Sequence, residues 1–171
     1  DLERNKYVKA IKYYKNKNYK KYQIIKNELK SYPLHANLEY KDLHNKNRPK
    51  PEDDSYQITK KAIKNAQEVL GLERVSALMT TTQDSLRLPV EIIDEYIDSQ
   101  FDSIFLRPLR PYGFAIKTKS YDKYRTKEWL TFYKEGLDYI LNLNKSGKFF
   151  VEIYARILLT KILTPYDVGY V

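Results

Sequence analysis

The chain contains no cysteine. This absence excludes disulfides, thiolate zinc sites, a cysteine nucleophile and a cysteine-ligated iron–sulfur cluster held by this chain alone. Only five glycines are scattered through 171 residues, so no phosphate-cradling glycine loop is present, and neither a GxSxG nor an HExxH spacing occurs. Apolar runs last only a few residues, and the first residues lack the apolar core of a signal peptide. We therefore expect no membrane span and a cytoplasmic location.

Charge is unevenly distributed. The net charge is +9, and residues 1–32 contain ten lysines and arginines against three acidic residues. The hydrophobic fraction of 42% is that of a globular protein, and the length predicts one domain with a real core. A cationic N-terminal arm favours a nucleic-acid or anionic partner.

Residues 1–35 are predicted to form this basic arm, with two short amphipathic helices separated by residues 15–18. Six tyrosines alternate with nine lysines in it. They could stack on bases and neutralise phosphates. The alternative is that the tyrosines face a core while the lysines are solvated. We favour this alternative because the tyrosines follow the apolar stripe of each helix.

Residues 33–56 contain three prolines and many turn formers, so they predict a loop, with a possible short strand at 36–40. Both histidines lie in this segment, and no further ligand accompanies them, so we predict no metal site. His44 and Arg48 are expected to make polar contacts where the loop meets a helix. That helix spans residues 56–70, capped by Asp54 or Ser55. Its predicted inward residues are Ile58, Ala62, Ala66 and Val69.

The central stretch predicts a βαβ unit. A strand at residues 75–79, a helix beginning at Pro89 and a strand at 103–106 follow one another, and the two strands should be parallel neighbours. The polar residues after each strand, 80–82 and 107–113, would then line one functional rim. An arginine pair there can bind a carboxylate or phosphate bidentately, or can close the rim through salt bridges.

The acidic residues of this helix are predicted to form a surface opposite its apolar stripe, which argues against paired-carboxylate catalysis. We therefore assign no catalytic residue. The three acids are Asp94, Glu95 and Asp98.

Two apolar helical patterns complete the chain. The first is capped by Thr126 and ends before Ser146; its inward stripe is Trp129, Leu130, Tyr133, Leu137, Ile140 and Leu141. The second forms another buried face up to Pro165; its members are Phe149, Phe150, Ile153, Ile157, Leu158 and Ile162.

Four stretches carry a resemblance: HNKNRP at 44–49, RVSALMTTT at 74–82, SIFLRPLRPYGFA at 103–115 and ILTPYDVGYV at 162–171. Together they resemble the radical S-adenosylmethionine (SAM) maturase of His-Xaa-Ser peptide-modification systems, over roughly residues 41–171. The resemblance implies an α/β fold in which residues 36–171 form a partial (β/α) barrel segment, preceded by the helical N-terminal arm.

The family chemistry implied is cleavage of SAM by a [4Fe–4S] cluster to a radical that abstracts hydrogen from a peptide. The implied partners are a ribosomally made peptide substrate and a partner maturase. By the same resemblance, the residues that contact the cofactor are Thr80, Thr81, Leu106 and Arg107. Those that border the peptide are His44, Arg48, Arg110 and Tyr112.

This sequence departs from the family pattern. The CxxxCxxC cluster motif is missing, and residues 37–40 read NLEY where the family has a Ser-Leu-Asp-Gly-Pro stretch nearby. The cysteine-bearing region that would follow Val171 is absent as well. We therefore expect an inactive segment of such a maturase, whether a fragment or a degenerate copy. The alternative is a small basic module that binds nucleic acid or an acidic peptide through the arm.

Overall fold

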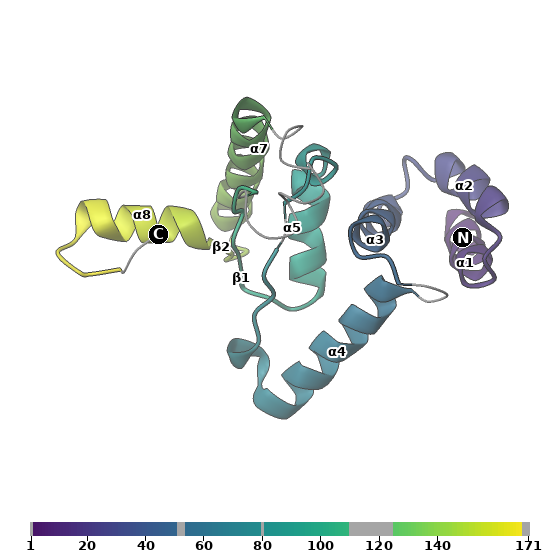
Figure 1. The fold of residues 1–171 in the computed structure, drawn as a ribbon, viewed down its shortest axis with the longest axis horizontal. Helices are drawn as coiled ribbons and strands as arrows, with labels where there is room; N and C mark the ends of the chain where they lie inside the picture. Colours follow the sequence, from purple (N-terminus) through teal and green to yellow (C-terminus); the bar gives the residue numbers. More distant parts are fainter. Residues whose placement is uncertain (1, 51–53, 80, 110–124, 169–171) are drawn as a thin grey trace.

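The structure is a computed structural model that describes residues 2–50, 54–79, 81–109 and 125–168. These residues are mostly helical, with a small two-stranded parallel sheet. The order is α1 (Leu2–Lys15), α2 (Tyr19–Glu28), α3 (His35–Asn47), α4 (Ser55–Leu70), α5 (Pro89–Asp98), β1 (Ser103–Ile104), α7 (Thr126–Lys145), β2 (Val151–Glu152) and α8 (Ile153–Leu163). Figure 1 shows α1 and α2 at one end of the molecule and α8 extending from the other.

The basic arm forms the two predicted helices. Between α1 and α2 the chain turns at Lys17, whose φ is +57°. Asn18 then caps α2 by accepting a hydrogen bond from the Lys21 amide. Tyr22 is fully buried, in a small core with Ala10, Leu29 and Leu38. The tyrosine stripe therefore faces a core, as the favoured alternative predicted.

The predicted loop at residues 33–56 is wrong for most of its length, because residues 35–47 form α3. The prolines misled the interpretation: Pro33 and Pro49 lie just outside the helix and do not interrupt it. The helix contributes Leu38 to the core of the arm and Leu43 to the central core. It begins at the predicted end of the arm and contacts both parts of the chain.

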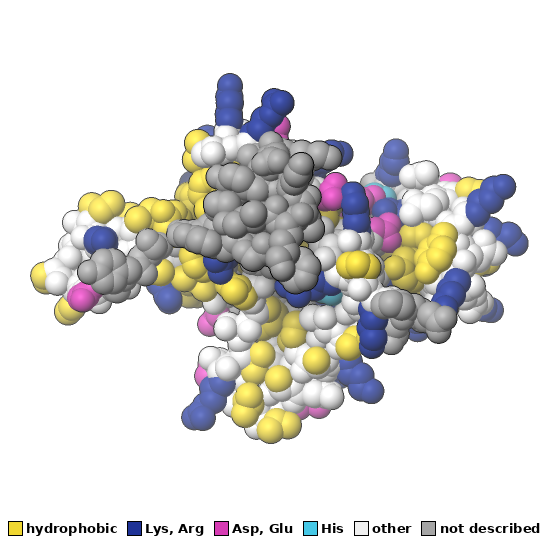
Figure 2. Space-filling model, viewed as in Figure 1, with side chains coloured by type: hydrophobic (Ala, Val, Ile, Leu, Met, Phe, Trp, Pro, Cys, Tyr) yellow, Lys and Arg dark blue, Asp and Glu magenta, His cyan; other side chains and the backbone are white. Residues whose placement is uncertain are grey.

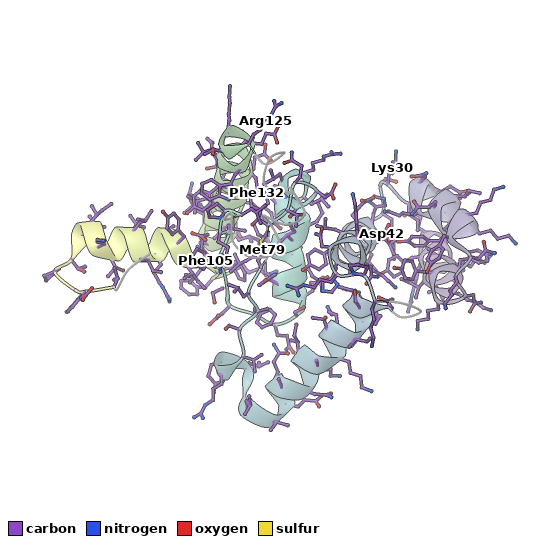
Figure 3. All side chains as sticks on the ribbon, in the orientation of Figure 1. Lys30, Asp42, Met79, Phe105, Arg125 and Phe132 are labelled. Atoms are coloured by element: carbon purple, nitrogen blue, oxygen red, sulfur yellow. The ribbon has the colours of Figure 1, made fainter. Side chains whose placement is uncertain are left out.

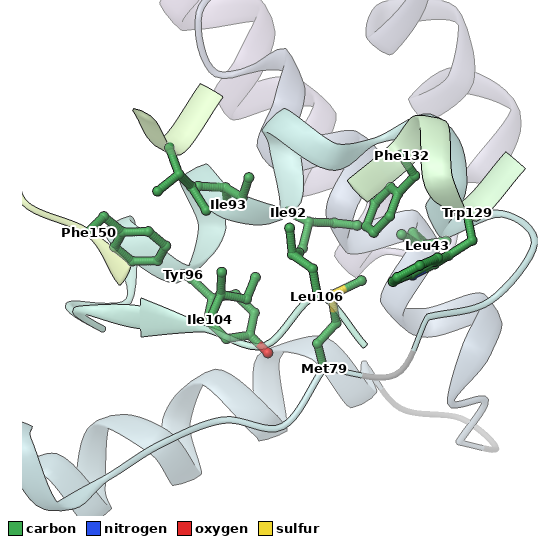
Figure 4. Packing of buried hydrophobic residues seen from close by; sticks show 11 residues of the cluster. Leu43, Met79, Ile92, Ile93, Tyr96, Ile104, Leu106, Trp129, Phe132 and Phe150 are labelled. Atoms are coloured by element: carbon green, nitrogen blue, oxygen red, sulfur yellow. The ribbon is translucent and has the colours of Figure 1, made fainter. Parts of the chain in front are cut away.

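The central core lies between α3, α5, β1 and α7. Figure 4 shows how its side chains interdigitate. Gly136 allows α7 to approach closely, since a Cβ there would lie 2.8 Å from a methyl carbon of Leu106. The buried members of this core are Leu43, Met79, Ile92, Ile93, Tyr96, Ile104, Leu106, Trp129, Phe132, Ile140 and Phe150.

The sheet differs from the predicted βαβ unit. β1 pairs in parallel with β2, in the register Ser103 with Val151 and Ile104 with Glu152. Residues 75–79 form no strand, and the hydroxyl of Tyr96 instead donates a hydrogen bond to the Ala77 carbonyl. The predicted neighbour of residues 103–106 was therefore wrong, and the described residues form no barrel.

Two helix faces also differ from prediction. In α4, Asp54 is the N-cap, but Ile58 is 40% and Val69 is 82% exposed, whereas Tyr56 and Gln67 are buried. Polar side chains of α4 turn inward because α5 offers them partners. In α7, Trp129 and Ile140 are buried as predicted, with Phe132 and Gly136 in addition. Leu130 and Leu141 are exposed, and α7 begins after Arg125, so Thr126 is its first residue and not its cap.

Helix α8 corrects the last predicted buried face. Phe150 is buried, but Phe149 is 77% exposed, and no residue of α8 is buried against the rest of the described chain. Figure 1 shows the reason: α8 leaves the body after β2, and Figure 2 shows apolar side chains along it. Among the described residues, no helix is long and apolar enough to cross a membrane.

Candidate functional site

Two of the predicted rim residues meet. Thr81 is 2% exposed, and its hydroxyl donates a hydrogen bond to the backbone carbonyl of Arg107, at 2.5 Å. The ends of the 75–79 and 103–106 segments are therefore adjacent, although no strand pairing joins these segments. We call this place the Thr81–Arg107 edge.

A buried carboxylate fixes this edge. Glu152 is 4% exposed, and its Oε1 accepts a hydrogen bond of 3.0 Å from the Leu106 amide. Its Oε2 accepts from the Tyr133 hydroxyl at 2.8 Å and from the Ala155 amide at 2.5 Å. Burial, followed by the nearby Glu152 charge, raises the pKa of Tyr133, so this hydroxyl remains a donor. Glu152 thus ties the segment that follows β1 to α7 and caps α8.

The four predicted cofactor contacts have different surroundings. Leu106 is fully buried in the central core, and the Thr81 hydroxyl is occupied by the Arg107 carbonyl. Arg107 is only partly buried, with its guanidinium 5.8 Å from the centre of the Phe105 ring. Thr80 lies outside the described residues. Any cofactor contact by these residues stays a prediction.

The predicted peptide-binding residues divide in the same way. Arg110 and Tyr112 lie outside the described residues. His44 and Arg48 line a cavity of about 360 Å³ between α3, α4, α5 and residues 76–79, which we call the α3–α5 cavity. Met79 lines it too and belongs to the central core with Leu106, so the cavity lies beside the segment that leads to Thr81.

Glu95 is the buried acid of this cavity, and its predicted place on an acidic surface was wrong. It is 4% exposed. Its Oε1 accepts hydrogen bonds from the Tyr56 hydroxyl at 2.9 Å, from Lys60 Nζ at 2.7 Å and, more weakly, from the Ser99 hydroxyl at 3.4 Å. Its Oε2 is buried without a hydrogen-bond partner among the residues that the structure describes.

His44 is neutral in this setting. Burial, followed by the charge of Arg48, lowers the pKa of its imidazole below the ordinary value of 6.5. Its Nδ1 lies 3.4 Å from the Ser55 hydroxyl, and its ring packs 5.8 Å from the Tyr56 ring. Within the described ranges, no group of three histidine or acidic residues could hold a metal ion.

The side chains that sequence reasoning missed lie on α4. Tyr56, Lys60, Ile63 and Gln67 recur at spacings of four, three and four, which places them on one helical face toward the cavity and α5. That face was obscured because two of its members are polar. The spacing was present in the sequence, but its partners Glu95 and Ser99 become visible only in the fold.

The arm has its own polar contacts. Lys26 is 6% exposed and pairs with Glu39 at 3.0 Å and Asp42 at 2.5 Å, and the Tyr22 hydroxyl donates to Asp42. These contacts join α2 to α3, the helix on which Figure 3 labels Asp42. Other lysines of α1 and α2 are exposed, as the dark side chains at that end of Figure 2 show; they include Lys9, Lys12, Lys15, Lys20 and Lys21.

Comparisons with known proteins give no relatives: no family model, no curated protein and no solved structure matches this chain. The site must therefore be interpreted from its own chemistry. It offers a half-buried arginine at the Thr81–Arg107 edge and a buried carboxylate, Glu95, among the residues that line the α3–α5 cavity. It offers no thiolate, because the chain has no cysteine.

Proposed function

We propose that this chain is a later segment of a radical SAM (β/α) barrel, of the kind found in maturases of His-Xaa-Ser systems. In this proposal, the Thr81–Arg107 edge is part of the rim that binds SAM or the peptide substrate. One observation carries the proposal. The hydrogen bond from Thr81 to the Arg107 carbonyl brings together the two segments that the βαβ pattern of the sequence assigned to one rim.

The residues of the chain do not fit the iron–sulfur cluster of the family. Such clusters are held by cysteine thiolates, and this sequence has none. We therefore propose no redox step for the chain by itself. The proposed role is binding: Arg107 is the described edge residue with a charged, partly exposed side chain, and a guanidinium can bind the carboxylate of SAM or of a peptide bidentately.

Calorimetric titration with SAM tests this proposal. Arg107→Ala should weaken SAM binding at least about tenfold, because it removes a charge-assisted hydrogen bond. Arg156→Ala removes an exposed arginine on α8 and is the matched control, which should bind as the original chain does. Absence of SAM binding, or equal binding by the Arg107 variant, would contradict the proposal. Release of 5′-deoxyadenosine from SAM by this chain alone would contradict the binding-only role.

A second candidate function is electrostatic binding of a nucleic acid or acidic peptide through the arm. The exposed lysines of α1 and α2 favour it. Base stacking contributes little to this candidate, because Tyr22 is buried and Tyr19, at 53% exposed, is the large exposed aromatic residue of the described arm. Phosphate neutralisation remains, and it predicts an affinity that falls linearly with salt on logarithmic axes.

Fluorescence anisotropy with a single-stranded oligonucleotide tests the second candidate. Replacing Lys9, Lys12 and Lys20 by glutamine should reduce the steepness of the salt dependence by about two units of slope at most. Replacing Lys61, Lys64 and Lys127, which are exposed on α4 and α7, by glutamine is the control for net charge. Binding that ignores salt, or that responds equally to both sets of substitutions, would contradict this function.

A further inference from the structure

The α3–α5 cavity is lined by a buried carboxylate that has an unused hydrogen-bond acceptor. Glu95 lines the cavity and is more than nine-tenths buried, and its Oε2 has no hydrogen-bond partner among the described residues. Its other oxygen accepts two strong hydrogen bonds, from Tyr56 and Lys60. Buried carboxylate oxygens are ordinarily satisfied, so an unsatisfied one on a residue that lines a cavity indicates a missing hydrogen-bond donor.

The cavity walls favour a ligand in which that donor group is attached to a flat, apolar ring. Four aromatic side chains line it: Tyr40, Tyr56, Tyr96 and Phe101. Tyr40 and Tyr56 meet edge to face at 5.9 Å, and Tyr96 and Phe101 lie 5.4 Å apart. Tyr96 appears beside Met79 in Figure 4, and Met79 completes this apolar wall. A volume of about 360 Å³ suits a small ligand and not a large cofactor.

The charges favour a neutral donor over a cation. Lys60 Nζ is 2.7 Å from Glu95 Oε1 and already neutralises this carboxylate. A second cation in the same cavity would be repelled by Lys60, whereas a neutral N–H group forms the hydrogen bond without that repulsion. At the rim, Arg48 contributes positive charge regardless of its other contacts, and the neutral imidazole of His44 adds none. An anionic group therefore fits the rim.

From these observations we propose that the α3–α5 cavity binds a small aminated heteroaromatic ring that carries an anionic group, of the 6-aminopurine nucleotide class. The ring amino group donates to Glu95 Oε2, the ring lies among the aromatic walls, and the phosphate faces Arg48. This site is separate from the Thr81–Arg107 edge, and the inference does not depend on the proposed function.

Glutamine at position 95 gives a test of selectivity. Lys60 can only donate hydrogen bonds, so in Glu95→Gln the amide oxygen must take the Oε1 position, and the amide NH2 must then take the Oε2 position. The wild-type carboxylate should prefer AMP, whose ring amino group is a donor. The variant should prefer IMP, which presents a carbonyl oxygen at the same ring position.

Isothermal titration of the whole chain with AMP and IMP measures this reversal. We expect AMP to bind wild type at least about tenfold more tightly than IMP, since an unpaired buried polar group opposes the wrong ring. We expect the order to invert in Glu95→Gln. Arg48→Gln should weaken AMP but leave adenosine unchanged. Circular dichroism establishes that each variant is folded.

Two results would overturn the inference: no saturable binding of AMP by wild type, or the same AMP-to-IMP preference in wild type and Glu95→Gln. SAM also contains a 6-aminopurine ring, so it could bind in this cavity or at the Thr81–Arg107 edge. Titration of SAM into the Glu95 and Arg107 variants distinguishes these two places. SAM affinity that depends on Glu95 and not on Arg107 places SAM in this cavity and counts against the edge. Dependence on Arg107 alone, with AMP still selected by Glu95, leaves two separate sites.

Discussion

The Thr81 hydroxyl and the Arg107 carbonyl are joined by a hydrogen bond that spans 26 positions of the chain. No strand pairing supports this contact, because residues 75–79 are not part of the sheet. The adjacency of the two segments therefore depends on side-chain hydrogen bonds. The Thr81 hydroxyl binds the Arg107 carbonyl, and the Glu152 carboxylate binds the Leu106 amide.

Thr81→Val should destabilise the fold by about 1–2 kcal/mol, because it keeps the side-chain shape but leaves the Arg107 carbonyl without this donor. Thr81→Ser retains the hydroxyl and should recover part of the loss. Urea denaturation followed by circular dichroism measures both variants. If Val and Ser are equally stable, the hydrogen bond does not hold the edge.

Lys41 is 1% exposed, with its Nζ 2.7 Å from Asp54 Oδ2 and 3.8 Å from the centre of the Tyr14 ring. Although burial by itself would raise the pKa of Asp54, the contacts from Lys41 and Asn45 outweigh it and lower the pKa. Lys41→Met should cost about 3 kcal/mol, since it leaves Asp54 without its buried cation.

The matched control is Asp54→Asn, which retains a side-chain oxygen to cap α4. The double variant should lose less unfolding free energy than the two single variants lose together, because the neutral amide needs no cation. Guanidinium or urea midpoints for the four proteins measure this coupling. Strict additivity would mean that Lys41 acts through packing alone.

His44 makes stability depend on pH. Its pKa in the folded protein lies below the unfolded value of 6.5, so the unfolded chain binds the proton more readily. The contribution of His44 is therefore complete above pH 6.5 and is lost as the pH falls. Urea midpoints measured between about pH 7 and pH 5 should fall more steeply for wild type than for His44→Gln. Parallel curves would show that His44 titrates alike in both states.

Features of the fold that depend on neighbouring residues in the sequence were predictable, and features that depend on tertiary partners were not. The bounds of α4 were predictable because Asp54 and Gly71 act within one turn of the helix ends. Its buried face was not, because Lys60 and Gln67 turn inward to meet Glu95 on α5 and the carbonyl of Ser99, which caps the end of α5. Only tertiary structure supplies those partners.

The candidate site shows the same division. The proximity of the segments ending at Thr81 and Arg107 was predicted, because the two segments were assigned to one rim. Glu95 was misplaced, since an acidic residue beside Asp94 in an amphipathic helix is usually solvated. The Asp94 side chain accepts a hydrogen bond from the Tyr139 hydroxyl at 2.6 Å, so even this neighbour is engaged by α7.

Phe149 and Phe150 test whether α8 extends away from the central core. They are neighbours in sequence, yet Phe149 is 77% exposed and Phe150 is 2% exposed. Phe150 is further fixed by Asn144, whose side chain exchanges two hydrogen bonds with its backbone, at 2.7 and 3.0 Å. The alternation follows from β2, which begins at the next residue and sends successive side chains to opposite faces.

Phe150→Ala should therefore cost about 3–4 kcal/mol, from lost burial and the cavity left behind. Phe149→Ala should change stability by less than about 0.5 kcal/mol. Both variants remove the same side-chain atoms, so the difference between their unfolding free energies in urea reports the difference in burial of the two rings. Equal losses would mean that Phe149 is also covered in solution, and that α8 folds back over it and does not extend from the body as Figure 1 shows.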